Sequence, residues 1–225
     1  MSAQEIISHL ESLSDEKNVA GMARFGIQGG RVLGISMPVL HALAKEHRKQ
    51  HTLALALWDS GIHEARILAV LVADPAQVTR DQAERWAHDL ESWDVCDQLC
   101  MRLLHRVPFA WDLAQDWCRR EHEFVKRAGF VLPAVMSFKN KKVPDQRFLE
   151  FFPELLRGAS DPRNYVKKAV SWAIREIGKR RPGLHPEALN LCDEILALDT
   201  PPARWIARDA LRELTSEKVL ARVRS

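Results

Sequence analysis

The residues best suited to chemistry in this sequence are a tryptophan and an aspartate within the stretch from Glu91 to Cys100. Read as the start of a helix with Ser92 as its cap, this stretch places Trp93 and Asp97 four residues apart on one helix face. An indole plane and a carboxylate would then face the same surroundings. Such a carboxylate is suited to stabilising a developing cation or orienting a water molecule.

Asp97 occupies one position of a weak internal repeat, and the other aligned positions carry cations. The aligned residues are Arg66, Asp97, Arg127, Lys168 and Arg208. The steps between them are 31, 30, 41 and 40 residues, a range typical of helical hairpins in solenoids. If the repeats stack, Asp97 is a single acid in a row of cations, which favours its ionised form at neutral pH. A structural salt bridge is the alternative interpretation of Asp97.

Helical periodicity runs through nearly the whole chain, and no run alternates convincingly like a strand. Helices are expected at residues 3–13, 15–24, 37–49, 52–59, 63–73, 80–90, from 93, and at 109–119, 122–138, 145–157, 163–178, 186–198, 202–214 and 216–223. Asp161 and Pro162 are expected to cap the helix that contains Lys168. Sharp helix boundaries and short turns predict an all-α fold, a curved α-solenoid (superhelix) of stacked antiparallel helix pairs. Because no long linker interrupts the chain, residues 1–225 are expected to form a single domain.

Composition describes an ordinary globular protein of 225 residues, with 46% hydrophobic and 28% charged residues. The N-terminal residues are polar, and the apolar run at residues 67–73 is too short to cross a bilayer. We therefore expect a cytoplasmic protein, in a bacterial-type cytosol or nucleoid, without membrane contact, that works as a monomer. The four cysteines have no paired spacing and are expected to be reduced and mostly buried.

Positive charge is concentrated in one part of the chain. Residues 119–181 contain 16 Lys and Arg against 7 Asp and Glu, a local excess of nine, although the whole chain has a net charge of only +3. A basic block of this kind indicates a surface that meets a polyanion such as nucleic acid, and a solvated lysine-rich face is the alternative. The basic turn at residues 179–183 is a candidate phosphate contact.

Two other patterns argue against phosphate-loop and metal chemistry. The glycine-rich stretch at residues 25–34 lacks the preceding strand and the following Gly-Lys-Ser/Thr of a phosphate-binding loop, so a connecting loop is predicted, with backbone contact to a partner's phosphate as the alternative. His47 and His51 have the four-residue spacing of a metal pair, but they lack the intervening glutamate and a clear third ligand. No metal site is predicted.

Several stretches, in order, resemble the AlkD-type DNA alkylation-repair family, which are DNA glycosylases built from HEAT-like helical repeats. The matching stretches are residues 22–25, 32–35, 93–97, 124–130 and 166–176. The resemblance covers roughly residues 15–215, and the order and spacing of the stretches are more specific than any one of them. It implies a solenoid of HEAT-like helix pairs whose concave basic surface binds duplex DNA.

The resemblance implies hydrolytic removal of N3- or N7-alkylated purines, such as 3-methyladenine and 7-methylguanine, from double-stranded DNA in base excision repair. Asp97 would be the catalytic carboxylate, Trp93 and Trp172 would pack against the deoxyribose of the lesion, and Arg127 would contact the DNA backbone near the scissile bond. Members of this family are expected to act without drawing the base into a deep pocket. Phe25 stands where tyrosine is expected, so it is a candidate DNA contact without the hydroxyl.

Further DNA contacts are expected from the cationic row and its neighbours, namely Arg66, Lys126, Lys167, Lys168 and Arg208. The chemistry suits these residues, because an alkylated purine already carries a positive charge and leaves without a general acid. The enzyme then has only to stabilise an oxocarbenium-like sugar, and one carboxylate can do this. Tryptophan faces add attraction to that cation of about 1 kcal/mol each. The reaction requires no metal or redox cofactor.

Two other functions are compatible with the sequence. A non-catalytic solenoid could bind distorted or branched DNA, and it would release no base from any alkylated substrate. A protein-interaction scaffold could present a groove to a peptide, but the basic block at residues 119–181 argues against it.

Overall fold

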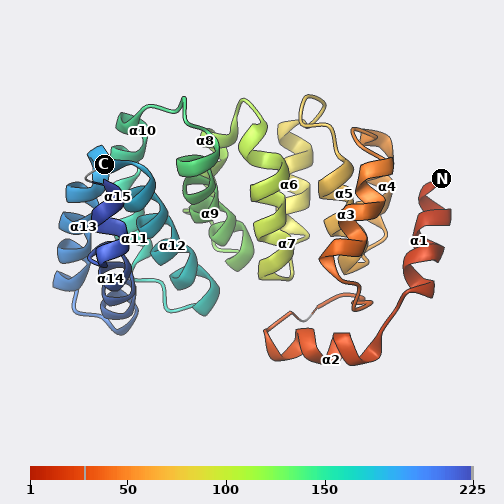
Figure 1. Ribbon diagram of the computed structural model, residues 1–225, viewed down its shortest axis with the longest axis horizontal. Helices are drawn as coiled ribbons and strands as arrows, with labels where there is room; N and C mark the ends of the chain where they lie inside the picture. The colour runs from red at the N-terminus through yellow and green to blue at the C-terminus, as the bar shows by residue number, and fades with distance from the viewer. Residues whose placement is uncertain (28, 224–225) are drawn as a thin grey trace. The chain divides into compact units, whose positions relative to one another are not determined.

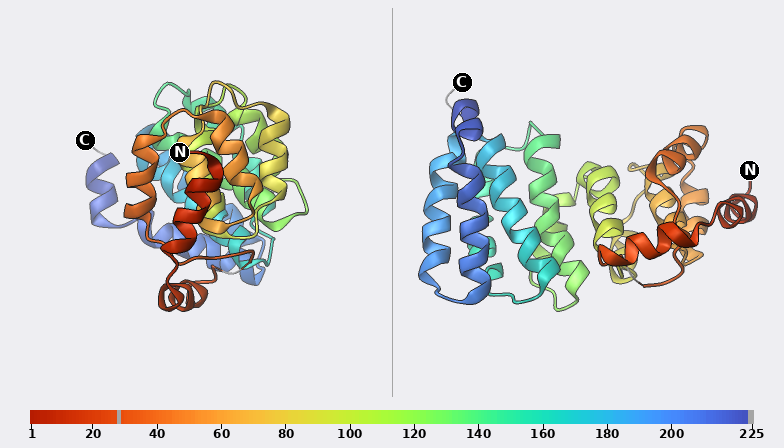
Figure 2. Two further views of the ribbon diagram at one scale, coloured as in Figure 1. Left: turned by 90° about the vertical axis from the view of Figure 1, so that its right-hand side faces the viewer. Right: turned by 60° about the horizontal axis from the view of Figure 1, so that its bottom comes forward.

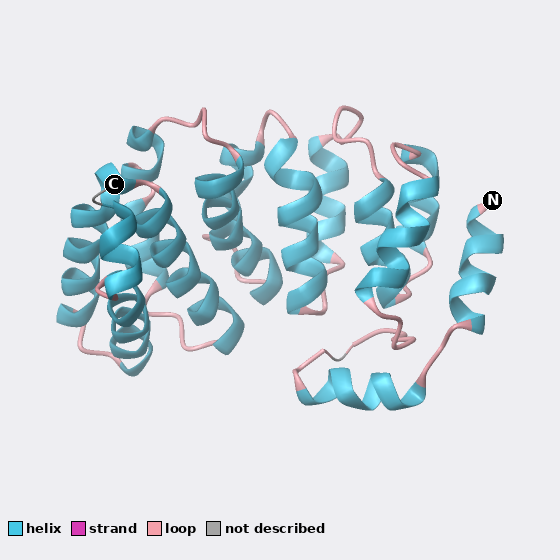
Figure 3. Ribbon diagram, viewed as in Figure 1, coloured by secondary structure: helices cyan, strands magenta, loops and turns pink. Residues whose placement is uncertain are grey.

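The computed structural model describes residues 1–27 and 29–223 and consists of helices joined by short turns (Figures 1 and 3). Within the described residues, the only β pairing is an isolated parallel bridge between Arg31 and Ile62. The all-α prediction is therefore confirmed. Gln28, in the glycine-rich stretch, lies outside the described residues. None of the helices described is long and apolar enough to cross a membrane.

The chain divides into two compact units, residues 1–107 and 108–225. The helices of unit 1 are α1 (Ala3–Ser12), α2 (Glu16–Arg24), α3 (Met37–Glu46), α4 (His51–Asp59), α5 (His63–Val72), α6 (Arg80–His88) and α7 (Trp93–Gln98), followed by a π-helix (Leu99–Leu103) and a 3₁₀ turn (Leu104–Arg106). The helices of unit 2 are α8 (Ala110–Trp117), α9 (Glu123–Lys139), α10 (Asp145–Leu149), α11 (Phe152–Gly158), α12 (Asn164–Arg180), α13 (His185–Ala197), α14 (Pro201–Leu214) and α15 (Glu217–Val223), with a 3₁₀ turn (Pro182–Leu184) before α13. The single domain stays a prediction.

Unit 1 is built around α5, which packs against α3, α4 and α7. The indole rings of Trp58 and Trp86 are both buried and stack face to face, with centroids 4.1 Å apart. The indole N–H of Trp58 is satisfied by the carboxylate of Asp89 at 2.8 Å. Helix α2 has no buried residue and lies across the ends of the other unit 1 helices (Figure 1). The core of unit 1 is therefore formed by α1 and by the helices from α3 to the π-helix, without α2.

Unit 2 is a two-layer stack in which α9, α12 and α14 lie side by side and α8, α11 and α13 pack on them (Figure 2). The helices approach closely where the sequence has glycine. A Cβ atom added at Gly129 of α9 would lie 2.2 Å from the backbone nitrogen of Cys118, so only glycine lets α8 and α9 meet there. The ring of Trp111 packs edge to face against those of Phe148 and Phe151 in the core of unit 2.

The helix expected at residues 145–157 is wrong, because the chain forms two short helices there, α10 and α11. Pro153 occupies the first turn of α11 and has no N–H to continue a helix from α10. The expected cap of α12 also differs. Asp161 accepts the backbone N–H of Arg163, and α12 begins only at Asn164. The first difference divides one expected helix into two, and the second moves the start of α12 to Asn164.

Candidate functional site

Trp93 and Asp97 both lie on α7, the pair of residues four apart that the sequence predicts. Trp93 is half-buried, and its indole Nε1–H donates a hydrogen bond to the carbonyl oxygen of Phe25 at 3.0 Å. The Asp97 residue is only 8% exposed. A carboxylate shielded from water to this degree interacts with nearby charge more strongly than one at an open surface.

The start of α7 is fixed by a cluster of polar side chains that packs it against α5. The Nε2 atom of His63 lies 2.9 Å from Oδ2 of Asp94, and the Ser92 hydroxyl donates to the other carboxylate oxygen. Burial raises the pKa of Asp94, but the hydrogen bonds from His63 and Ser92 outweigh it and leave the pKa below its usual value. Ser92 is the N-cap residue of α7, as the sequence predicts, but its hydroxyl donates to Asp94 and forms no hydrogen bond with a backbone N–H of the helix.

The loop at residues 25–35 is anchored to unit 1 by one completely buried carboxylate. Glu64 accepts the backbone N–H groups of Leu33, Gly34 and Ile35 at 2.9, 2.7 and 3.2 Å. Gly34 has a φ of +81°, a conformation that favours glycine. The same loop begins at Phe25, which is 75% exposed. The backbone carbonyl oxygen of Phe25 accepts the indole N–H of Trp93. The predicted connecting loop is confirmed, and it supports one edge of Trp93.

The helix that carries Asp97 changes from α to π geometry after Gln98, one residue beyond Asp97. Residues Leu99–Leu103 form a π-helix, and its buried side chains, Leu99, Cys100 and Leu103, face the core of unit 1. Single π turns inside helices are frequent at functional sites, because they change the direction of neighbouring side chains. The apolar periodicity of the sequence gives no signal for this turn.

In unit 2, the two predicted site residues have defined hydrogen bonds. Arg127 of α9 is 6% exposed, and its Nη1–H donates to the carbonyl oxygen of Tyr165 at 2.7 Å. Trp172 of α12 is half-buried, and its indole N–H donates to the carboxylate of Glu176 at 3.3 Å. One edge of the Trp172 ring is thus fixed by its own helix, as Trp93 is fixed by Phe25.

The predicted cationic contacts differ in how freely they face solvent. Arg66 in unit 1 donates to the carbonyl oxygen of Asp89 at 2.8 Å, and its guanidinium lies 5.4 Å from the Trp58 ring centroid. In unit 2, the ammonium of Lys167 lies 4.6 Å from the ring centroid of Trp205. Lys168 and Arg208 are exposed, and neither forms an ion pair with any residue in the described part of the chain.

Lys126 is held by an acidic residue at the turn before α12. Asp161 binds Lys126 at 3.1 Å and Arg163 at 2.6 Å. Burial raises the pKa of Asp161, but the hydrogen bonds from Arg163 and Lys126 outweigh it and lower the pKa to about 2. Lys126 is therefore part of the scaffold that joins the starts of α9 and α12.

We expect Asp161→Asn to lower the free energy of unfolding by about 2 kcal/mol at pH 7. The folded-state pKa lies below its usual value, so this stabilisation is present above about pH 4 and is lost as the pH falls towards 2. Urea unfolding of both proteins from pH 7 to pH 2 measures the difference, which should shrink on acidification. Asp116→Asn is the control, because Asp116 forms a half-exposed ion pair with Arg120 worth less than about 1 kcal/mol. An equal loss in both variants at pH 7 would contradict the prediction.

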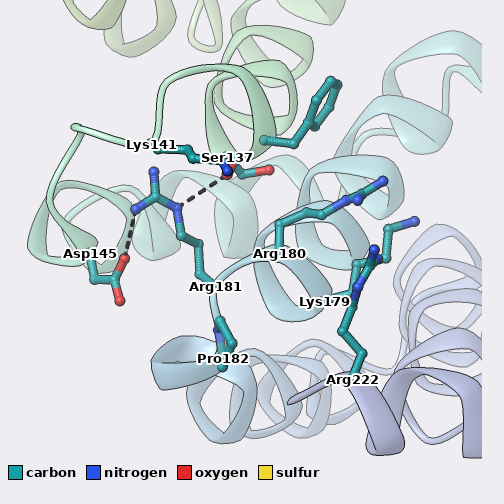
Figure 4. A pocket seen from close by; sticks show the side chains of 9 residues that line it. Ser137, Lys141, Asp145, Lys179, Arg180, Arg181, Pro182 and Arg222 are labelled. Atoms are coloured by element: carbon teal, nitrogen blue, oxygen red, sulfur yellow. Dashed lines mark hydrogen bonds and ion pairs between the residues drawn. The ribbon is translucent and has the colours of Figure 1, made fainter. Parts of the chain in front are cut away.

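The basic turn predicted to contact phosphate borders a hollow of about 530 Å³ at the C-terminal ends of α9 and α12 (Figure 4). Arg181 in this turn is mostly buried, and its guanidinium binds the carbonyl oxygens of Ser137, Asn140 and Val143 and the carboxylate of Asp145. Those carbonyls belong to the end of α9 and the turn after it. Arg181 is thus occupied in closing that helix end.

The remaining predicted features are structural. All four cysteines are buried and free, and burial raises the pKa of Cys118 and Cys192 to about 12. His51 lies 3.0 Å from the Gln82 side-chain oxygen. Within residues 1–27 and 29–223, no three His, Cys, Asp or Glu side chains gather as a metal site would require.

Two features of these units were not predicted from the sequence. They are the hydrogen bond between His63 and Asp94 and the exposed ring of Trp205. Both follow from one signal, the position three residues before each aligned member of the repeat. That position holds His63, Asp94, Phe124, Tyr165 and Trp205. Because positions i and i+3 share a helix face, these side chains lie beside the residues that the repeat brings into line.

Comparison with known proteins gives a family and a fold. The profile of the DNA alkylation repair enzyme family matches residues 6–214. No curated protein matches the chain significantly. A solved structure from a family described as related to the HEAT-like repeat DNA glycosylases, with affinity for branched DNA structures, superimposes with a TM-score of 0.77. It shares 19% identity, and the alignment covers 86% of this chain and 83% of that one.

This likeness confirms the HEAT-like fold that the sequence predicts. The family profile covers nearly the whole chain, both units included. The chain belongs to the DNA alkylation repair enzyme family.

Proposed function

We propose that this protein is a DNA glycosylase that removes N3- and N7-alkylated purines from duplex DNA. The observation that carries the proposal is the pair on α7. Asp97 is nearly buried and lies one helical turn after Trp93, whose ring orientation is set by its hydrogen bond to the Phe25 carbonyl. Family membership supports a repair enzyme. The substrate and the reaction are those that the resemblance to the AlkD-type glycosylases implies, and the chemistry of this pair suits them.

In the proposed reaction, the bond between C1′ of the deoxyribose and the ring nitrogen of the purine breaks. Its electron pair goes to the base, which already carries a positive charge and leaves as a neutral molecule. Asp97 stabilises the positive charge that develops on the sugar, because an anion in a poorly hydrated site interacts strongly with a nearby cation. Asp97 orients a water molecule, whose oxygen forms the new bond to C1′ and whose released proton passes to the solvent.

The other assigned roles follow the fixed geometry of the aromatic rings. Trp93 donates its N–H to Phe25, and Trp172 donates its N–H to Glu176, so each ring has a set orientation. A fixed ring loses little conformational entropy when a sugar packs on it. We assign both rings to the deoxyribose of the lesion and Arg127 to the DNA backbone. Lys168 and Arg208, which are exposed, are assigned to further phosphates.

The test is to incubate the protein with duplex DNA methylated at purine nitrogens and to quantify released bases by mass spectrometry. Free 7-methylguanine or 3-methyladenine should appear in the presence of a chelator. Unmethylated duplex of the same sequence should release no base. Methylated DNA that binds the protein but yields no free base would contradict the proposal.

A second candidate function is non-catalytic binding of branched or distorted DNA. It is favoured by the low exposure of Asp97 and Arg127, which suits structural roles, and by the branched-DNA affinity described for the protein of similar fold. The same assay separates the two candidates, because this function gives salt-sensitive binding to branched DNA with no released base.

A further inference from the structure

Three neighbouring helices of unit 2 repeat an aromatic residue three positions before a cation. The pairs are Phe124 and Arg127 on α9, Tyr165 and Lys168 on α12, and Trp205 and Arg208 on α14. Helix α9 packs on α12, and α12 packs on α14. The turns that enter these helices lie along the same edge of the unit (Figures 2 and 3). We call this set the aromatic ladder.

In the first two steps of the ladder, the aromatic rings pack against each other, and only the cation of the second step, Lys168, is exposed. The rings of Phe124 and Tyr165 lie with their centroids 5.4 Å apart and are both half-buried. Arg127 donates to the carbonyl oxygen of Tyr165. The two rings therefore leave little surface on which a base could stack.

The third step is open. The Trp205 residue is 38% exposed, and the Lys167 ammonium lies 4.6 Å from its ring centroid. The ring borders a hollow of about 410 Å³. The residues lining this hollow are Pro201, Arg204, Trp205, Arg208, Asp209 and Arg212. An indole face is thus available beside a concentration of positive charge.

The cations around Trp205 are not equally available. Arg204 is paired with Asp199 at 2.6 Å, and Arg212 is paired with Asp209. Arg208 is exposed and has no ion-pair partner within residues 1–27 and 29–223. Arg208 sits one turn from Trp205 on the same helix face. The hollow therefore combines one open aromatic ring with one guanidinium free to bind an anion.

This combination suits an unpaired nucleotide. An aromatic ring stacks on a base only when that base is not already stacked inside a duplex, and a neighbouring cation then binds its phosphate. A continuous duplex offers phosphates to Arg208 but no free base face to Trp205. The exposed ring of Trp205 therefore adds a preference for unpaired nucleotides over continuous duplex, which cations alone would not give.

We propose that Trp205 and Arg208 form a subsite for an unpaired base in DNA, with Trp205 stacking on the base and Arg208 binding the adjacent phosphate. The proposal rests on the proposed DNA binding and is independent of catalysis by Asp97. It predicts that this protein binds a duplex with one extrahelical nucleotide more tightly than the same duplex fully paired.

The experiment measures fluorescence anisotropy at several salt concentrations with three labelled probes: a paired duplex, the same duplex with one bulged nucleotide, and single-stranded oligothymidylate. Trp205→Ala should weaken binding of the bulged and single-stranded probes about tenfold and change duplex binding less than twofold. Trp205→Phe should restore most of the loss. Leu198→Ala, which removes an equally exposed apolar side chain, is the matched control.

Arg208→Ala should weaken binding of all three probes. For each probe it should also reduce the slope of log K against log salt concentration by about one. Lys218→Ala removes an exposed cation from α15 and is its matched control. Equal losses for paired and bulged duplex in Trp205→Ala, or no loss, would overturn the proposal, provided that thermal unfolding shows the variant to be folded. A wild-type protein that prefers the bulge through Trp205 but releases no methylated base would support this subsite and contradict the glycosylase function.

Discussion

Asp97→Asn is expected to reduce the rate of methylated-base release at least a hundredfold while leaving DNA affinity nearly unchanged. The substitution keeps the size of the side chain and removes the negative charge that the proposed mechanism places beside the developing cation. Loss of one preorganised electrostatic group in an active site typically costs about 10²–10³ in rate. The carboxylate is nearly buried, so bulk water cannot replace its charge.

Single-turnover release from methylated duplex gives the rate, and anisotropy with the same duplex gives the affinity. If Asp97 faces DNA as proposed, removing its charge reduces the repulsion of phosphate, so binding should stay equal or become slightly tighter. Asp81→Asn is the matched control, because it removes an exposed acid from α6 in the same unit. A release rate within threefold of wild type in Asp97→Asn would remove Asp97 from the mechanism.

The helical framework could be predicted from the sequence because local patterns determine it. Caps, prolines and apolar periodicity place most helix starts within a few residues. The failures lie where a tertiary contact changes a local preference. Phe148 and Phe151 are both buried in unit 2, and the chain leaves the helix between α10 and α11, so that Pro153 lies in the first turn of a new one. The Ser92 hydroxyl turns to Asp94, because Asp94 is held by His63 from another helix.

The candidate site could be predicted in part. The four-residue spacing of Trp93 and Asp97 fixes them on one helix, whatever the rest of the chain does. The burial of Asp97 depends on tertiary packing, and the hydrogen bond of Trp93 involves the Phe25 carbonyl, 68 residues earlier in the chain. No local pattern specifies either of them. Arg181 shows the same limit. Its basic neighbours indicate a phosphate contact, whereas its guanidinium closes the end of α9 (Figure 4).

A single side chain, Glu64, connects the stability of unit 1 to the candidate site. Its carboxylate is completely buried and accepts three consecutive backbone N–H groups of the loop that begins at Phe25. That loop supplies the carbonyl that binds the Trp93 indole. No other side chain in the described part of the chain accepts all three of these N–H groups, so their satisfaction depends on Glu64.

Glu64→Ala is expected to lower the free energy of unfolding by about 3 kcal/mol or more, because each buried N–H left without an acceptor costs roughly 1–3 kcal/mol. Glu64→Gln should cost about 1 kcal/mol. Its amide oxygen can still accept from Gly34 and Ile35, but its amide nitrogen then faces the N–H of Leu33. Glu46→Ala, an exposed change in the same unit, should stay within about 0.5 kcal/mol of wild type.

Urea unfolding measures these losses, and hydrogen exchange followed by mass spectrometry locates them. Exchange of the amides at residues 33–35 should accelerate in the order wild type, Glu64→Gln, Glu64→Ala. If Trp93 depends on this loop for its orientation, release of methylated base should fall in the same order below the unfolding transition. Fast exchange at residues 33–35 with an unchanged release rate would show that Trp93 keeps its position without the loop, and the support assigned to the Phe25 carbonyl would then be wrong.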